Sequence, residues 1–318
     1  MRRGFVLLAL VLGWVGLEVT LQAAGLAARW IYRPQLNHPG APTLLCLGDS
    51  HTFGVGVPVD RTYPAQLERL LAAQGLAVNV VNLGVPGQNT SQIRRHLPEW
   101  IARYRPAAVV VLAGVNDGWN RADAVYAELE DGWFRGQPGQ LWPARLLTGL
   151  SCLKTYRLAA YLLRRAERDR RDIEQARNRS GQLVLHDFNP AAASPGPDDD
   201  ARRAYGNLCR IAALGRERRT PVILMTYVGL PPITFDAPNQ VLRDASRDCG
   251  ALLLDNDAIL HPELMEPNGL INSDLVSRLF FPDMHPAAEG YHRIALNLAR
   301  LLLDQGLLPK AGSKRESP

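Results

Sequence analysis

Short apolar runs alternate with amphipathic helical patterns along most of this chain of 318 residues. The apolar runs have the length and composition of buried parallel strands. They span residues 43–47, 78–82, 107–113, 221–227 and 251–255. The helical patterns span residues 64–74, 91–104, 198–218, 239–249 and 287–305. Because parallel strands need crossover helices, this rhythm predicts an α/β fold with a doubly wound parallel sheet and right-handed crossovers. We expect a flavodoxin-like strand order.

The composition limits the class of protein. Hydrophobic residues make up 47% of the chain and charged residues 21%, which is typical of a globular protein with a large core. The net charge of +5 allows attraction to anionic lipid heads or acidic glycans. Arginines and acids interleave between 164 and 174, as on a solvated helix face, so no nucleic-acid partner is predicted. No cluster has metal-ligand spacing and no glycine-rich phosphate loop occurs, so no metal or cofactor is predicted.

Polar blocks stand where three of the predicted strands end and where the last helix begins. They occupy residues 47–54, 81–87, 114–117 and 281–286. The first contains Gly48-Asp49-Ser50, directly after a buried strand. Open α/β sheets bind ligands at the carboxyl ends of their strands, so these blocks predict one site on one edge of the sheet.

This ordered set of blocks resembles the SGNH hydrolases, also called the GDSL lipase/esterase family, over residues 43–303. A serine hydroxyl needs a base to become a nucleophile, and histidine titrates in the useful range. Ser50 is therefore the predicted nucleophile and His285 its base. The resemblance implies an oxyanion hole made of the backbone N–H groups of Ser50 and Gly84 and the side-chain amide of Asn116. It also implies hydrolysis of a carboxylic ester.

The acid that orients the histidine departs from the family pattern. In most of the family it lies three residues before the histidine, where this chain has Pro282. Asp283, two residues before His285, is our candidate, since a shortened loop brings its carboxylate to the imidazole. Asp274 from a preceding loop, or a dyad without an acid, are the alternatives.

Several of these residues also have a structural explanation. Gly84 fits a turn glycine with positive φ, and Asn116 fits the cap of the following element. Asp49 and Asp117 are expected to hydrogen-bond loop backbone rather than to take part in chemistry. His51 is adjacent to Ser50 and is expected to point elsewhere, not to act as a second base.

The N-terminal residues 1–30 are predicted to be a membrane anchor or a signal segment. Two arginines precede an apolar run that continues through Ala28 and is interrupted by Glu18. This length spans a membrane if Glu18 is tolerated. The arginine- and leucine-rich composition indicates a bacterial source. We therefore predict a single-pass inner-membrane anchor with the catalytic domain in the periplasm; secretion after signal cleavage is the alternative.

The remaining chain is assigned to one hydrolase domain, residues 40–308, followed by a polar tail, 309–318. An insertion at 119–197 contains a predicted helix, 146–179. This helix either forms a lid or a lipid-facing surface, or packs on the body without a functional role. Cys46 is expected to be buried and unpaired. The other cysteines imply no disulfide framework, although a Cys209–Cys249 bridge is possible in an oxidising compartment.

Together these features predict an extracytoplasmic serine esterase that acts on an O-acyl glycan or a lipid ester through an acyl-Ser50 intermediate. One alternative is an O-acyltransferase for exported polysaccharide, which needs a membrane partner as acyl donor. The other is a non-catalytic glycan-binding or assembly module on the same fold.

Overall fold

The computed structural model describes residues 2–31, 36–118, 120, 146, 149, 150, 153–156, 158, 159 and 197–308. The chain divides into two compact units. One comprises Met1–Pro34 and Glu128–Asn189, and the other comprises Gln35–Ala127 and Pro190–Pro318. The predicted helix 146–179 and the polar tail lie mostly or wholly outside the described residues.

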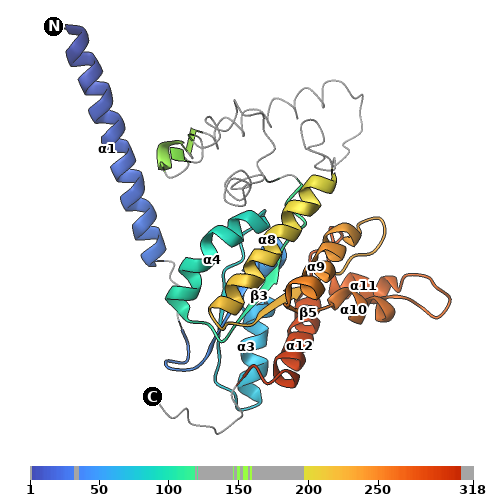
Figure 1. Cartoon of the computed structure of the whole chain (residues 1–318). Helices are drawn as coiled ribbons and strands as arrows, with labels where there is room; N and C mark the ends of the chain where they lie inside the picture. The colour runs from blue at the N-terminus through green and yellow to red at the C-terminus, as the bar shows by residue number, and fades with distance from the viewer. Residues whose placement is uncertain are drawn as a thin grey trace, which may run out of the picture. The chain divides into compact units, whose positions relative to one another are not determined.

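The second unit is built on a parallel sheet of five strands in the order β2-β1-β3-β4-β5 (Figure 1). The strands are β1 Thr43–Gly48, β2 Asn79–Asn82, β3 Ala108–Leu112, β4 Val222–Met225 and β5 Leu252–Leu254. Every residue of β1, β3 and β4 is buried, whereas the edge strands β2 and β5 are partly exposed. This burial explains why the central strands are uninterrupted apolar runs.

Helices cover both faces of the sheet. The long helices are α3 Tyr63–Ala73, α4 Thr90–Tyr104, α8 Pro197–Glu217, α9 Asp236–Cys249 and α12 Ala288–Asp304. On one face α3 packs against α12, and on the other α8 packs between α4 and α9 (Figure 1). The shorter elements are α2 Ser50–Phe53, the 3₁₀ turn η1 Val59–Arg61, α10 Asn256–Leu264 and α11 Ser273–Leu279.

The predicted fold class and strand order are confirmed. Each predicted strand and each of the predicted body helices is present, with ends that shift by at most three residues. Two short helices between β5 and α12, α10 and α11, differ from the prediction, which has no helix there. Their caps were visible as signals, since the side chain of Asp255 accepts from Ala258 N and that of Asn272 accepts from Leu275 N.

A disulfide joins α8 to α9 through Cys209 and Cys249, 40 residues apart in sequence. Cys46 is free and buried in β1, as predicted. The cross-link restricts the unfolded chain, and a loop of this size typically contributes about 2–4 kcal/mol. Disulfides persist in oxidising compartments.

We expect reduction of the Cys209–Cys249 bridge to lower the melting temperature of the full-length protein by about 5–10 °C. Thermal unfolding with and without dithiothreitol measures this shift. The double variant Cys209→Ser/Cys249→Ser is the control, because it melts at the lower temperature under both conditions. Equal melting temperatures for oxidised and reduced wild type would contradict a stabilising bridge.

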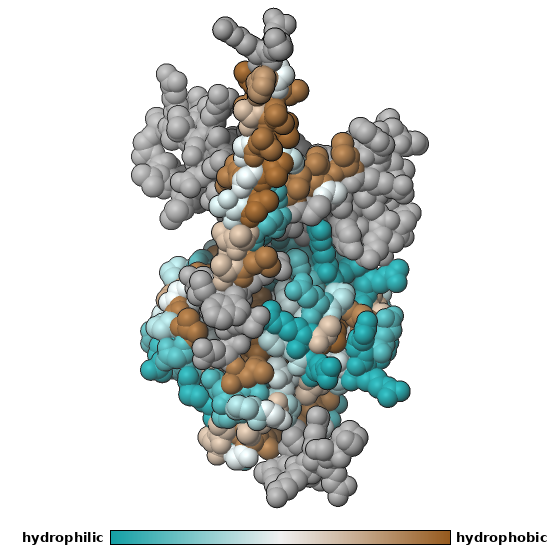
Figure 2. Space-filling model, turned by 90° about the vertical axis from the view of Figure 1, so that its left-hand side faces the viewer, coloured by the Kyte–Doolittle hydropathy of each residue, from teal (hydrophilic) through white to brown (hydrophobic). Residues whose placement is uncertain are grey.

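Among the described residues of the first unit, one helix is long and apolar enough to cross a membrane, α1 Arg2–Ile31. Its span Gly4–Ala27 has a mean hydropathy of 2.1, and hydrophobic residues cover most of its surface in Figure 2. A signal sequence near the N-terminus has the same properties. The carboxylate of Glu18 accepts hydrogen bonds from the backbone N–H of Lys154 and of Thr155 at 2.9 and 2.8 Å. These bonds, with one from Gln22, give the acid inside the apolar run its polar partners.

Candidate active site

Ser50 is the first residue of α2, immediately after the buried strand β1. Asp49 caps this short helix, since its Oδ1 accepts from the backbone N–H of His51 at 2.9 Å. Gly54 ends the helix in the left-handed region, with φ of 94°. The turn therefore places Ser50 at the carboxyl edge of the sheet, where α/β folds bind ligands.

His285 reaches Ser50 from the loop before α12, more than two hundred residues away in sequence. Its Nε2 lies 2.8 Å from Ser50 Oγ, within hydrogen-bond distance. This is the spacing that proton transfer from the hydroxyl to the imidazole requires. The structure thus brings the predicted nucleophile and the predicted base together.

Asp283 lies on the other side of the imidazole. Its Oδ2 is 3.0 Å from His285 Nδ1, although off the direction of the ring N–H, so the contact is not an aligned hydrogen bond and becomes an ion pair only when His285 is protonated. Its Oδ1 also accepts from the backbone N–H of His285 at 3.2 Å. The alternative acid, Asp274, lies in the first turn of α11, and within the described residues it has no contact with His285.

A residue with left-handed backbone conformation compensates for the shortened spacing between the acid and the histidine. Met284, between Asp283 and His285, has φ of 63° although it is not glycine. A tight turn closes around it, with hydrogen bonds from Met284 N to Phe281 O and from Phe281 N to His285 O, both 2.8 Å. Such a conformation costs on the order of 1 kcal/mol, and here it folds the carboxylate back onto the imidazole.

The environment favours the neutral form of the histidine. Burial lowers the pKa of the His285 imidazole, and the adjacent His51 lowers it further, while the Asp283 carboxylate raises it by less than these two lower it. Burial opposes the charge of Asp283, but the backbone N–H and the imidazole of His285 outweigh it and lower the pKa of Asp283. His285 is therefore unprotonated, and available as a base, at a lower pH than an ordinary histidine.

Two of the three predicted oxyanion donors have protein partners. The backbone N–H of Gly84 donates to Asn82 Oδ1 at 2.9 Å. The amide of Asn116 donates to the carbonyl of Gln88 at 3.1 Å and to Asp49 at 3.3 Å. The N–H of Ser50 belongs to the first residue of a helix, where no intrahelical acceptor exists.

Gly84 is required by close packing and not by a left-handed turn. Its φ is not positive, so the interpretation as a positive-φ turn glycine is wrong. Any Cβ at this position would overlap the backbone of Thr52 and Phe53 in α2. The close approach sets the loop after β2 directly beside the helix that begins with Ser50.

Asp49 and Asp117 hold loops, as predicted. Asp117 accepts from the backbone N–H and the hydroxyl of Thr90 at 3.1 and 2.5 Å. Burial raises the pKa of Asp117 to about 6. Asp49 is fully buried and also accepts from the hydroxyl of Tyr227 at 2.6 Å, a partner that the sequence reading missed although Tyr227 ends a predicted strand.

The prediction that His51 points away from the site is wrong. Its ring stacks on that of His285, with centroids 4.5 Å apart and planes 22° from parallel. A residue adjacent to Ser50 in an extended chain would point to the opposite side, but the helical turn of α2 rotates both side chains toward the same region.

The chain matches a known protein family over most of its length. The family model for the GDSL-like lipase/acylhydrolase family matches residues 46–293, a stretch from β1 into α12. The chain belongs to this family. The predicted nucleophile, base, acid and oxyanion donors all lie within the matched part.

Two named relatives of the GDSL-like family match the chain over a shorter stretch. An arylesterase of Vibrio mimicus is 33% identical over 75 residues, which is 24% of this chain and 38% of that protein. Esterase TesA of Pseudomonas aeruginosa is 36% identical over 78 residues, 24% of this chain and 39% of that protein. The chain thus spans less than two-fifths of the length of either relative.

Solved structures of similar proteins cover more of the chain at lower identity. A crystal structure of TesA covers 84% of this chain and 99% of its own, with a TM-score of 0.46 and 18% identity. The lipase/acylhydrolase of Enterococcus faecalis covers 86% of this chain and 100% of its own, with a TM-score of 0.49 and 15% identity.

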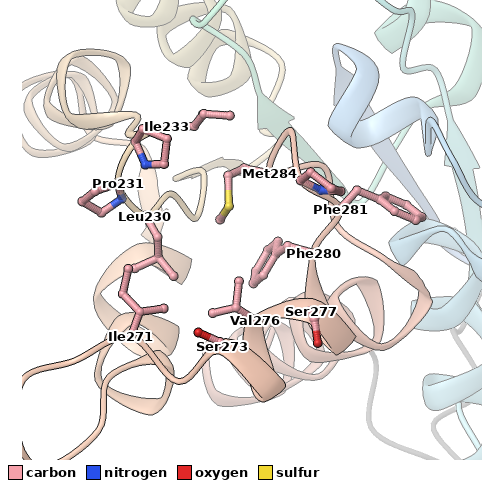
Figure 3. Close-up of a pocket in the computed structure, with 12 residues that line it drawn as sticks. Leu230, Pro231, Ile233, Ile271, Ser273, Val276, Ser277, Phe280, Phe281 and Met284 are labelled. Carbon is pink, nitrogen blue, oxygen red and sulfur yellow. The ribbon is translucent and has the colours of Figure 1, made fainter.

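An apolar pocket adjoins the loop that carries the acid and histidine of this GDSL-like site. Its volume is about 430 Å³, and its walls come from three stretches of chain: residues 230–233; Ile271, Ser273, Val276 and Ser277; and residues 280–282 with Met284. Figure 3 shows the side chains of Met284, Phe280 and Val276 directed into the same space. Met284 therefore has two roles, since it links Asp283 to His285 and forms part of this wall.

Proposed function

We propose that this protein is a serine esterase that hydrolyses a carboxylic ester through an acyl-Ser50 intermediate. The observation that carries the proposal is the chain of contacts from Ser50 Oγ to His285 Nε2 at 2.8 Å and from His285 Nδ1 to Asp283 at 3.0 Å. This arrangement serves acyl transfer to a serine. It argues against a non-catalytic module, which needs no aligned nucleophile and base.

In the first half-reaction, Ser50 Oγ attacks the ester carbonyl while its proton moves to His285 Nε2. The carbonyl C–O π electrons move to the oxygen and form a tetrahedral oxyanion. When that intermediate collapses, the C–O bond to the alcohol breaks, and His285 gives its proton to the leaving oxygen. Asp283 stabilises the imidazolium that exists between these steps.

In the second half-reaction, His285 takes a proton from water, and the hydroxide oxygen bonds to the acyl carbon. Collapse of this second intermediate breaks the bond to Ser50 Oγ, which recovers the proton from His285. The products are a carboxylic acid and free enzyme. No cofactor takes part in this sequence of steps.

The oxyanion is stabilised by the N–H groups of Ser50 and Gly84 and by the Asn116 amide. Gly84 and Asn116 exchange their partners Asn82 and Gln88 for the developing negative charge. Such donors are worth more in the transition state than in the ground state, because the charge they face is larger.

We place the catalytic domain outside the cytoplasm, tethered by α1. The span Gly4–Ala27 is long enough to cross a bilayer, and two arginines precede it, which favours a cytoplasmic N-terminus. The Cys209–Cys249 disulfide supports an oxidising compartment such as the bacterial periplasm. A lipid ester or an O-acylated glycan is accessible there.

The apolar pocket beside the Asp283–His285 loop is suited to the acyl chain of the ester. In full-length protein in lipid nanodiscs, we expect kcat/KM for p-nitrophenyl octanoate to exceed that for the acetate by about tenfold or more. The reason is that each buried CH₂ contributes about 0.8 kcal/mol. Val276→Phe, which fills the pocket, should remove most of this preference.

Leu270→Phe is the matched control for the filled pocket, since Leu270 is 64% exposed on the same segment and does not line the cavity. It should keep the preference of the wild type. An acetyl ester turned over as well as the octanoyl ester by wild type would contradict an acyl-chain pocket and favour an O-acetyl substrate.

Hydrolysis of p-nitrophenyl esters by the full-length chain, measured beside Ser50→Ala, tests the proposed activity. A wild type that is active and a variant that is silent support it. Equal activity in both proteins overturns it.

A further inference from the structure

His51 lies in an aromatic enclosure next to the base. One face of its ring stacks on His285, and its edges meet the rings of Tyr227 and Phe235 at centroid distances of 5.0 and 5.6 Å, both nearly perpendicular. These partners come from the loops after β4 and before α9 and α12. His51 is only 5% exposed. Its orientation is therefore fixed by packing on several sides.

The two ring nitrogens of His51 lack hydrogen bonds from the described residues that would offset the cost of burying them. Within the described residues, neither ring nitrogen of His51 has a hydrogen-bond partner. Nδ1 lies 3.4 Å from Asp49 Oδ1, but that oxygen already accepts the backbone N–H of His51, and the direction is poor for a second bond. A buried polar ring without aligned hydrogen-bond partners costs free energy. This cost calls for a reason in the chemistry next to it.

We propose that His51 is a positioning residue for His285: a buried ring whose face holds the imidazole in the plane that points Nε2 at Ser50 Oγ. This role rests on the proposed esterase function, in which His285 is the base. Ser50 Oγ lies within hydrogen-bond distance of His285, whereas no described residue makes a hydrogen bond with either ring nitrogen of His51. Parallel stacking restricts rotation of the imidazole about its bonds and so preserves the 2.8 Å contact.

The stack also affects the charge that His285 can carry. Two imidazolium rings 4.5 Å apart repel each other, so a protonated His51 disfavours protonation of His285. The pKa of His285 is lowered in part by this neighbour. The other titratable groups that face the pair are Asp49 and Tyr227 on His51 and Asp283 on His285. The two aspartates act in the opposite direction.

The experiment compares His51→Leu, which fills the space without a flat face, with His51→Phe, which restores the flat face without any charge. Full-length proteins in nanodiscs are assayed with p-nitrophenyl butyrate, and rates are divided by the concentration of serines labelled by a phosphonate ester. His51→Leu should lower kcat about tenfold or more, with KM changed less than about threefold. His51→Phe should recover kcat to within about threefold of wild type.

The pH profile of kcat/KM supplies a second readout, which a purely structural role of His51 would not change. In His51→Phe the acid limb of kcat/KM should shift to higher pH, because the repulsion that lowers the pKa of His285 is gone. Equal kcat for the leucine and phenylalanine variants overturns the positioning role, and an unshifted limb in His51→Phe overturns the charge coupling. If His51→Leu does not fold, a kcat of His51→Phe more than about tenfold below wild type overturns the positioning role.

A measurement without substrate separates this proposal from the esterase function. The titration midpoint of the His285 Cε1–H resonance in histidine-labelled protein should also be higher in His51→Phe than in wild type. A higher midpoint in a protein that hydrolyses no ester would leave the stack supported and the esterase function overturned. Identical midpoints in an active esterase would overturn the coupling alone.

Discussion

Ser50→Ala should lower kcat/KM for p-nitrophenyl butyrate by at least about 10⁴-fold. The variant keeps the fold, because Ser50 Oγ has its contact with His285 and the helix cap is made by Asp49 instead. It removes the oxygen that must form the acyl bond, so water has to attack directly. Steady-state rates of the purified full-length variant, with its melting temperature as a check on folding, measure the loss.

His285→Gln should cause a loss of similar size, and the double variant should be no worse than either single one. Residues that act as one unit lose their effect together, since a serine without its base is a poor nucleophile. Multiplicative losses in the double variant would show that the two side chains act independently, contrary to the 2.8 Å contact.

The second large effect is expected for Asp283→Asn, a loss of about 10²–10³-fold in kcat. The amide keeps the size of the carboxylate but loses the charge that stabilises the imidazolium of His285. We expect less than the loss seen for a fully buried acid, because the side chain of Asp283 is 63% exposed and its contact with Nδ1 is not aligned. Solvent screens part of its charge.

The pH profile of Asp283→Asn should move in a defined direction. Asp283 raises the pKa of His285, so its removal lets the imidazole stay neutral to still lower pH, and the acid limb of kcat/KM shifts downward. The matched control is Asp274→Asn, since Asp274 is the other acid that the sequence leaves open. A large loss in Asp274→Asn with little change in Asp283→Asn would show that the wrong carboxylate has been assigned.

The sheet and its flanking helices could be predicted because buried strands and half-buried helices have recognisable apolar patterns in the sequence. Strands β1, β3 and β4 are buried over their whole length, and each is an apolar run that ends in small or polar residues. Their shared carboxyl edge then predicts that Ser50 and Asn116 lie close together. His285 could be predicted because it stands in the block just before the last amphipathic helix.

The orientation of side chains inside the site could not be predicted in the same way. Whether His51 points toward or away from the site depends on the one turn of helix in α2, which is too short to leave a periodic pattern. The approach of Asp283 to His285 depends on the left-handed conformation of Met284, a residue whose type gives no sign of it. The hydrogen bond from the Asn116 amide to the carbonyl of Gln88 likewise depends on a tertiary contact.

The most direct test of the central claim is to trap the acyl-enzyme. Full-length protein is mixed rapidly with p-nitrophenyl octanoate, quenched in acid within milliseconds to seconds, and analysed by intact mass and peptide mapping. We predict a burst of p-nitrophenol and a mass increase of one octanoyl group on the peptide that contains Ser50, both absent from Ser50→Ala. Turnover without any acyl adduct, or an adduct on another residue, would contradict the account.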